Sequence, residues 1–214
     1  LLLIFGLLSM GIATAFILLQ NNYKRLLAYS SIEHIGIIAI GMGIGGFWGI
    51  YGALLHMLNH AIVKPLLFFT TGRVRLKYHT TEIGKVKGAI TVLPVAGTVM
   101  LLAALAIAGS PPFNIFLSEY TILKAAIDGG NWITFALFIA FSTIIFGGVL
   151  RHFGGMAFGK PNIDHEHEKE KNGDNKMSLI VIVVMVAIML VLGLYIPGFL
   201  NEMLNNSVKV ITGE

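Results

Sequence analysis

Residues 59–69 read NHAIVKPLLFF and place a histidine and a lysine about one helical turn apart inside a long apolar run. His56 lies one turn before His60, so His56, His60 and Lys64 share one helical face at i, i+4, i+8 spacing. An ionisable side chain in hydrocarbon is costly unless it is paired or hydrated. This stripe therefore predicts a membrane helix whose polar face meets a protein interior or a water-filled path, as in proteins that move ions.

The composition of the chain is that of an integral membrane protein. Of its 214 residues, 56% are hydrophobic and only 12% are charged, whereas about 25% are charged in a soluble domain. The apolar runs are long and do not alternate, which favours helices over an outer-membrane barrel. The net charge of +4 comes from loops between these runs, where basic residues signal topology rather than nucleic-acid binding. We expect a multi-pass protein of the cell inner or plasma membrane, in contact with lipid.

The chain contains no cysteine, which excludes a disulfide, a thiolate zinc site and a cysteine-ligated iron–sulfur or nickel–iron centre within it. We therefore expect no cofactor and no catalytic centre here, and any redox chemistry must reside on another subunit. His165 and His167 lie in the mixed-charge segment DHEHE, where a solvated loop is the better interpretation than a metal site. Leu1 begins inside an apolar run without a basic start, so we expect a C-terminal piece of a longer protein rather than a signal peptide.

Six membrane crossings are predicted, because about 20 apolar residues span a bilayer. The fold class is all-α, and Pro65 predicts a kink or local unwinding beside Lys64. We expect five spans in residues 1–153, a charged cytoplasmic linker at 154–177, and a last helix with its tail at 178–214. The apolar runs that give the six spans cover residues 1–20, 26–46, 47–72, 89–127, 131–152 and 178–195.

The run 89–127 is predicted to be one discontinuous span. It is too long for a single straight crossing, and its middle contains Gly109, Pro111 and Pro112. A residue that precedes proline is disfavoured in the α region, so a helix should break there. The basic segments before and after this run lie on one side of the membrane only if the run crosses once. This predicts two half-helices broken at Gly109–Pro112, basic loops in the cytoplasm, and both chain ends outside.

The second span carries two ionisable residues, Glu33 and His34. Either residue could relay protons or bridge to the third span, and the alternative is an interhelical hydrogen bond that only orders the packing. The nearby hydroxyls of Tyr29, Ser30 and Ser31 are further candidates for a proton path.

Glu119 follows the predicted helix break, in a position typical of transporters, where irregular backbone at membrane depth lines a cavity. The alternative is a structural salt bridge, for which Lys124 is only a loose partner. For Lys64 the alternative is that its side chain snorkels to the basic loop. Eight residues, or roughly 12 Å of helix, separate it from Gly72, which is long for that reach.

Residues 24–36, KRLLAYSSIEHIG, strongly resemble the signature of the antiporter-like proton-translocating subunits. These subunits occur in respiratory complex I, in Mrp-type cation/proton antiporters and in membrane-bound nickel–iron hydrogenases. The segment from His60 to Lys64 and the PPF…SEY break are similar to the same family, so three motifs match in the right order across most of the chain. The IEH and AGSPPF forms look most like the hydrogenase-4 component F type.

The resemblance implies a larger subunit of about fourteen helices, built on two inverted five-helix repeats that each contain a broken helix. This chain would be the second repeat plus the last helix. His34 and His60 would belong to a polar axis, with Lys64 as its central carrier and Glu119 as the acidic end of the outward half-channel. The first repeat, with its own glutamate and lysine, would lie outside this chain, which is not expected to pump alone.

These features predict a subunit that moves protons or Na⁺, driven by a redox complex, with a membrane-bound nickel–iron hydrogenase as the favoured complex. Its partners would be the other membrane subunits of that complex. The expected proton-transfer residues are Lys64, His60, Glu119, His34, His56 and Glu33. Two alternatives stay open: an Mrp-type Na⁺/H⁺ antiporter subunit, and a structural membrane anchor.

Overall fold

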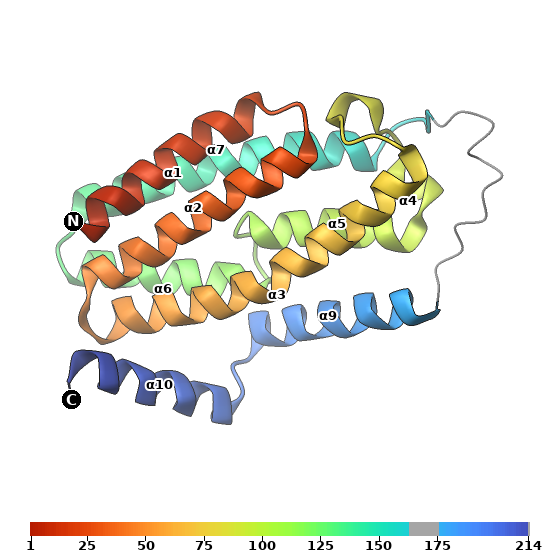
Figure 1. Cartoon of the computed structure of the whole chain (residues 1–214). Coiled ribbons are helices and arrows are strands. Elements are labelled where there is room, and N and C mark those ends of the chain that lie inside the picture. Colours follow the sequence, from red (N-terminus) through yellow and green to blue (C-terminus); the bar gives the residue numbers. More distant parts are fainter. Residues whose placement is uncertain (163–175, 214) are drawn as a thin grey trace.

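A computed structural model describes residues 1–162 and 176–213, and this part of the chain is a bundle of helices (Figure 1). The order of elements and their bounds are α1 (Leu2–Leu19), α2 (Tyr23–Ile44), α3 (Gly46–Tyr78), η1 (Ile83–Lys85), α4 (Ala89–Val92), α5 (Pro94–Ile107), α6 (Asn114–Asp128), α7 (Trp132–Ala157), α9 (Lys176–Leu194) and α10 (Gly198–Thr212). The predicted all-α fold is confirmed.

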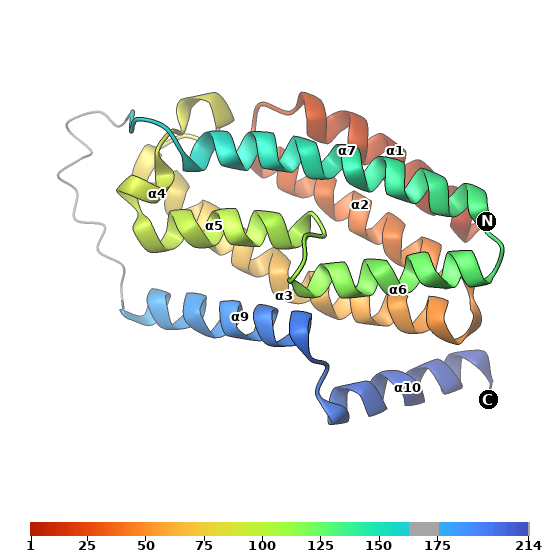
Figure 2. The same cartoon turned by 180° about the vertical axis from the view of Figure 1, so that it is seen from behind.

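Five of these helices are long and apolar enough to cross a membrane: α1, α2, α3, α7 and α9. The shorter helices α5 and α6 follow one another in nearly the same direction and together run along the bundle once (Figure 2). They form the expected discontinuous span, which gives six crossings in the described residues. His165 and His167 lie outside those residues.

The turn between α1 and α2 is tied to the loop after α3. Asn22 caps α2, because its side chain accepts hydrogen bonds from the backbone N–H groups of Lys24 and Arg25. The Asn22 Nδ2 group donates to Thr81 Oγ1 at 2.7 Å, and the Tyr23 hydroxyl donates to the Thr80 carbonyl at 2.8 Å. These bonds hold the two basic segments of the chain together.

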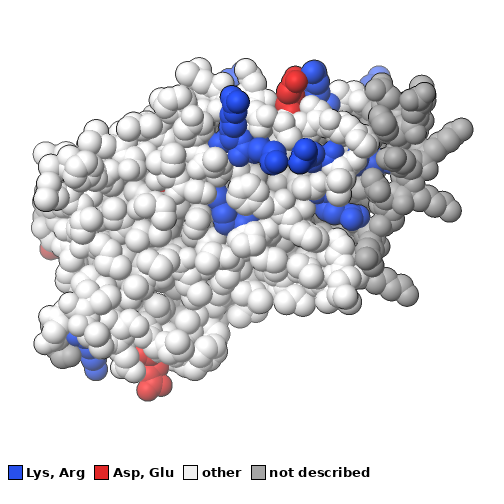
Figure 3. All heavy atoms as spheres, viewed as in Figure 1, with Lys and Arg blue, Asp and Glu red and all other residues white. Residues whose placement is uncertain are grey.

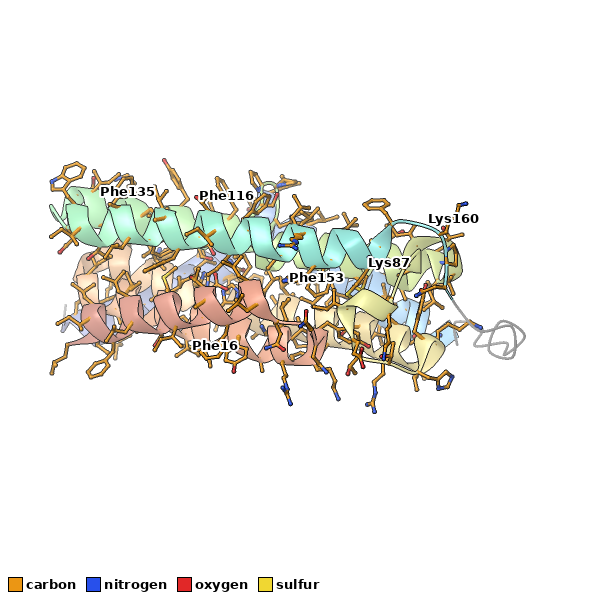
Figure 4. The ribbon with its side chains drawn as sticks, turned by 90° about the horizontal axis from the view of Figure 1, so that it is seen from above. Phe16, Lys87, Phe116, Phe135, Phe153 and Lys160 are labelled. Carbon is orange, nitrogen blue, oxygen red and sulfur yellow. The ribbon has the colours of Figure 1, made fainter. Side chains whose placement is uncertain are left out.

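Lysine and arginine side chains consequently gather toward one end of the bundle (Figure 3). Figure 4 shows Lys87 and Lys160 at that end, on segments that precede and follow the α4–α7 region. Both chain ends lie at the other end (Figure 1). The predicted grouping of the basic loops on one side, away from both chain ends, therefore holds for the described residues, which include Lys160 but not Lys169 or Lys171 of the linker. Their cytoplasmic location stays a prediction.

Pro65 does not interrupt α3, which is helical from Gly46 to Tyr78. The local unwinding that Pro65 suggested is therefore wrong, whereas a bend of α3 is visible in Figures 1 and 2. Proline removes one backbone donor and crowds the preceding turn, and a membrane helix accommodates both by bending.

No helix was predicted in the tail after the last span, and residues 198–212 form the helix α10. Its Leu204 and Val208 are buried together with Ile50 and Leu55 of α3. The Tyr51 hydroxyl donates to Asn201 Oδ1 at 2.8 Å and links the same two helices. The i, i+4 spacing of Leu204 and Val208 was the available sequence signal for an amphipathic helix.

Helices α1 and α2 meet backbone to backbone at two glycines. A Cβ atom on Gly36 would lie 2.7 Å from the Gly6 carbonyl oxygen, and one on Gly6 would lie 2.7 Å from that of Gly36. Small residues permit this close approach of membrane helices.

We expect Gly36→Val to lower the stability of the full-length protein by about 1–3 kcal/mol through overpacking, measured by thermal unfolding in detergent. Gly147→Val on α7 is the matched control, because open space surrounds Gly147. Equal effects of the two substitutions would contradict this interpretation.

Candidate functional site

The six ionisable residues that the sequence singled out are brought together by α2, α3 and α6. Five of them are buried, with exposed fractions of 0% for His34 and His56, 3% for Glu33, 6% for Lys64 and 8% for Glu119. His60 is partly buried. A soluble core seldom buries so many charged groups together, so this cluster is the candidate functional site.

Lys64 is held inside the bundle by α2. Its Nζ donates a hydrogen bond to Ser30 Oγ at 2.5 Å, so the alternative in which Lys64 snorkels to the basic loop is wrong. Glu33 lies one turn after Ser30 on α2 and is close enough for its charge to act on Lys64. Both serine hydroxyls, those of Ser30 and Ser31, donate to the Leu27 carbonyl of their own helix. Of these two, Ser30 also accepts from Lys64 and so joins the cluster.

Tyr29, the third of those hydroxyl residues, lies against α1. Its ring stacks on Phe16 of α1 with 4.6 Å between the ring centroids. The tyrosine therefore contributes to the packing of α1 against α2.

A hydrogen-bonded chain of side chains crosses from α2 through α3 to α6. His34 Nδ1 lies 2.9 Å from His56 Nε2, and His56 Nδ1 lies 2.9 Å from Ser118 Oγ. The His34 ring also lies against the His60 ring, with 4.9 Å between their centroids. Both histidines of α3 thus lie against His34, and they share one face of α3 as their helical spacing predicted.

Two asparagines lock the start of α6 onto α3. Asn59 Nδ2 donates to the Asn114 carbonyl at 2.7 Å, and Asn114 Nδ2 donates to Asn59 Oδ1 at 3.0 Å. Sequence reasoning missed this pair and Ser118. The signal was present in the position of Asn59 directly before His60, and in that of Asn114 directly after the predicted break.

The helix break lies where the glycine and the two prolines predicted it, between Ile107 and Asn114. Gly109 adopts φ +74°, a conformation that favours glycine. The Ser110 backbone N–H bonds to the Leu105 carbonyl and the Phe113 N–H bonds to the Ser110 carbonyl. These bonds satisfy some of the backbone N–H and C=O groups that the helix break leaves without helical partners. Such groups need hydrogen bonds at membrane depth, because the hydrocarbon offers none.

Glu119 occupies the space that the break opens. A Cβ atom on Gly109 would overlap the Glu119 carboxylate. The two residues line a cavity of about 280 Å³ together with Ser142 and Thr143 of α7. Lys124 instead pairs with Asp128 at the surface, at 2.5 Å, so the alternative of a Glu119–Lys124 salt bridge is not realised.

His34, His56 and Glu119 could in principle ligate a metal, because their ligand atoms lie within 4.8 Å of one another. The two histidine nitrogens that face each other are however 2.9 Å apart, a separation at which they share a hydrogen bond. That hydrogen bond uses the nitrogen of each ring that faces the other histidine. These three residues are thus a buried cluster of ionisable groups, in which the two histidines share a hydrogen bond.

Residues 1–146 match the family described as "NADH:quinone oxidoreductase/Mrp antiporter, TM". A hydrogenase-4 component F homolog of Methylacidiphilum infernorum is 35% identical over 159 residues, which cover 74% of this chain and 33% of that protein. The Na⁺/H⁺ antiporter subunit A1 of Staphylococcus saprophyticus is 34% identical over 145 residues, which cover 62% of this chain and 18% of that protein. The chain thus spans a third or less of the length of these relatives.

The structure superposes on a chain of the membrane-bound sulfane sulfur reductase, an archaeal respiratory membrane complex, with a TM-score of 0.81 and 29% identity. The match covers 99% of this chain and 41% of that one. The six-span fold with its broken helix is therefore a fold that subunits of multi-subunit membrane complexes share.

Proposed function

This chain belongs to the NADH:quinone oxidoreductase/Mrp antiporter transmembrane family, and from that premise we propose that it is part of a subunit that moves protons, or Na⁺, for a redox complex. The observation that carries the proposal is the buried line of ionisable groups from Lys64, through the histidines, to Glu119 at the helix break. Groups that exchange protons at membrane depth are the parts from which such pathways are built.

Lys64 is the carrier in this proposal. A buried lysine gives up its proton readily and regains it when an anion approaches, and Glu33 on α2 is the carboxyl group whose charge, when it is ionised, acts on Lys64. Electron transfer in a redox partner would change the charge along this axis. The proton of Lys64 would then pass to the histidines and on to Glu119, which opens to the cavity beside α7.

Similarity supports a redox partner, because a hydrogenase-4 component F homolog and the sulfane sulfur reductase are among the matches. We favour a membrane-bound nickel–iron hydrogenase, with the other membrane subunits of that complex as partners. An Mrp-type antiporter is the second candidate, supported by the 34% identity to an Na⁺/H⁺ antiporter subunit.

The two candidates differ in their partner chains, which gentle detergent purification of the native complex and mass spectrometry would identify. We expect the full-length subunit to co-purify with a nickel–iron large subunit and iron–sulfur proteins. Recovery with small antiporter subunits alone would overturn the redox proposal and leave the Mrp-type assignment. Recovery of the subunit without any partner chain would argue against both candidates.

A further inference from the structure

Ser118 is the end of the histidine chain, and its hydroxyl group has three neighbours. Ser118 Oγ lies 2.8 Å from the Ile115 carbonyl, 2.9 Å from His56 Nδ1 and 3.4 Å from Asn59 Nδ2. A hydroxyl has one proton to donate and two lone pairs to accept with. The carbonyl can only accept and the amide nitrogen can only donate, so the remaining role of the hydroxyl falls on His56.

The donor and acceptor roles along this hydrogen-bonded series of side chains follow from the number of protons that each side chain carries. With its proton on the Ile115 carbonyl, Ser118 must accept from a His56 Nδ1–H group. A neutral imidazole carries one N–H, so His56 Nε2 is an acceptor and His34 must donate from Nδ1. The proton of neutral His34 is then on Nδ1, and its Nε2 presents a lone pair. Within the described part of the chain this buried nitrogen meets no partner at full hydrogen-bonding geometry, and the Ile107 backbone carbonyl is the acceptor near the His34 ring that would favour the other tautomer.

We propose that Ser118 is a positioning residue that fixes the tautomers of His56 and His34, and so makes His34 Nε2 the atom that accepts a proton arriving from Lys64. This inference rests on the proposed function for the direction of proton movement. The tautomer assignment rests instead on the hydrogen bonds of Ser118, so the two can fail separately.

The proton balance is simple. The Lys64 ammonium loses one proton and becomes an amine, and His34 gains that proton at Nε2 and becomes an imidazolium. The imidazolium then returns to neutrality by giving one proton to the Glu119 carboxylate, which becomes a carboxylic acid. One ring nitrogen of each of His34 and His56 and one Glu119 carboxylate oxygen lie within 4.8 Å of one another, so this last transfer needs a side-chain movement that brings donor and acceptor to hydrogen-bonding distance. His60 Nε2 is also unpartnered among the described residues, and the His60 ring lies beside the His34 ring. His60 therefore offers a second proton acceptor, one helical turn before Lys64 on α3.

The tautomers can be read directly from ¹⁵N chemical shifts of histidine in the full-length complex in lipid bilayers, with His34→Gln and His56→Gln samples to assign the signals. We expect N–H signals from the Nδ1 atoms of His34 and His56 and lone-pair signals from their Nε2 atoms. The opposite pattern, with the proton on His34 Nε2, would mean that the Ser118 hydroxyl donates to His56, and it would overturn the proposal.

Substitutions at Ser118 add a second readout. Ser118→Ala removes the hydroxyl and should give mixed histidine tautomers and about a tenfold or larger loss of ion movement, since a wrong histidine tautomer slows proton transfer severely. Ser118→Thr keeps the hydroxyl and should retain the wild-type ¹⁵N pattern. Ser207→Ala is the matched control, because Ser207 donates to the Met203 carbonyl of its own helix at 2.9 Å and contacts no histidine of the chain described here.

The outcomes separate the inference from the proposed function. Wild-type tautomers in Ser118→Ala would overturn the role of Ser118. The expected ¹⁵N pattern in a protein whose ion movement does not depend on Lys64 would leave the tautomer assignment standing and overturn the proposed pathway instead.

Discussion

Lys64→Ala is expected to lower ion movement by the full-length complex by about a hundredfold or more, the range in which a positioned proton-transfer group contributes. The substitution removes the cation that bonds to Ser30 and faces the charge of Glu33. The complex should still assemble, because the helix crossings that position α3 are made by the histidine and asparagine bonds to α2 and α6. Proton or Na⁺ flux in sealed vesicles, with subunit content measured by native mass spectrometry, tests this expectation.

Lys124→Ala is the control for loss of a lysine, since Lys124 pairs with Asp128 at the surface. Lys64→Met separates transport from packing, because methionine keeps most of the volume without the charge. If Lys64→Met moved ions at the normal rate, the polar cluster would serve packing alone and the chain would be a structural anchor.

Glu119→Gln should show the same loss of ion movement as Lys64→Ala. Glu202→Gln is its control, because Glu202 lies on the exposed face of α10.

The fold could be predicted largely from the sequence, because bilayer thickness imposes a simple length rule on apolar helices. Pro111 and Pro112 located the broken span, and the basic segments required it to cross once. The helix α10 was missed, because its contacts with Tyr51 and Ile50 of α3 come from a helix far away in the chain. Its polar composition resembles that of a solvated tail.

The candidate site could be predicted only in part. An ionisable residue in an apolar run is visible in the sequence, so Lys64 and His56 were found directly. Their partners are neutral polar residues such as Asn59, Asn114 and Ser118, which occur in many helices without a special role. Only the packing of α3 against α6 shows that these residues bond to one another.

Gly109→Ala is expected to reduce ion movement by about tenfold or more, because it would move the carboxylate at the end of the proposed pathway. The substitution has two physical effects. It places an L side chain at φ +74°, which costs roughly 1–2 kcal/mol, and its Cβ overlaps the Glu119 carboxylate. A carboxylate at the end of a flexible side chain can swing aside, so the second effect displaces Glu119 from the histidines rather than unfolding the bundle.

Gly130→Ala separates these two effects. Gly130 has nearly the same conformation, with φ +70°, and nothing lies within 4 Å of its Cβ position. Both variants should therefore lose similar stability in thermal unfolding, and only Gly109→Ala should lose ion movement. Glu119→Asp shortens the side chain by one methylene group, so Gly109→Ala combined with Glu119→Asp should move ions faster than Gly109→Ala alone. Equal flux in the two glycine variants would show that the space left by Gly109 serves only the turn and that the position of the Glu119 carboxylate does not limit transport.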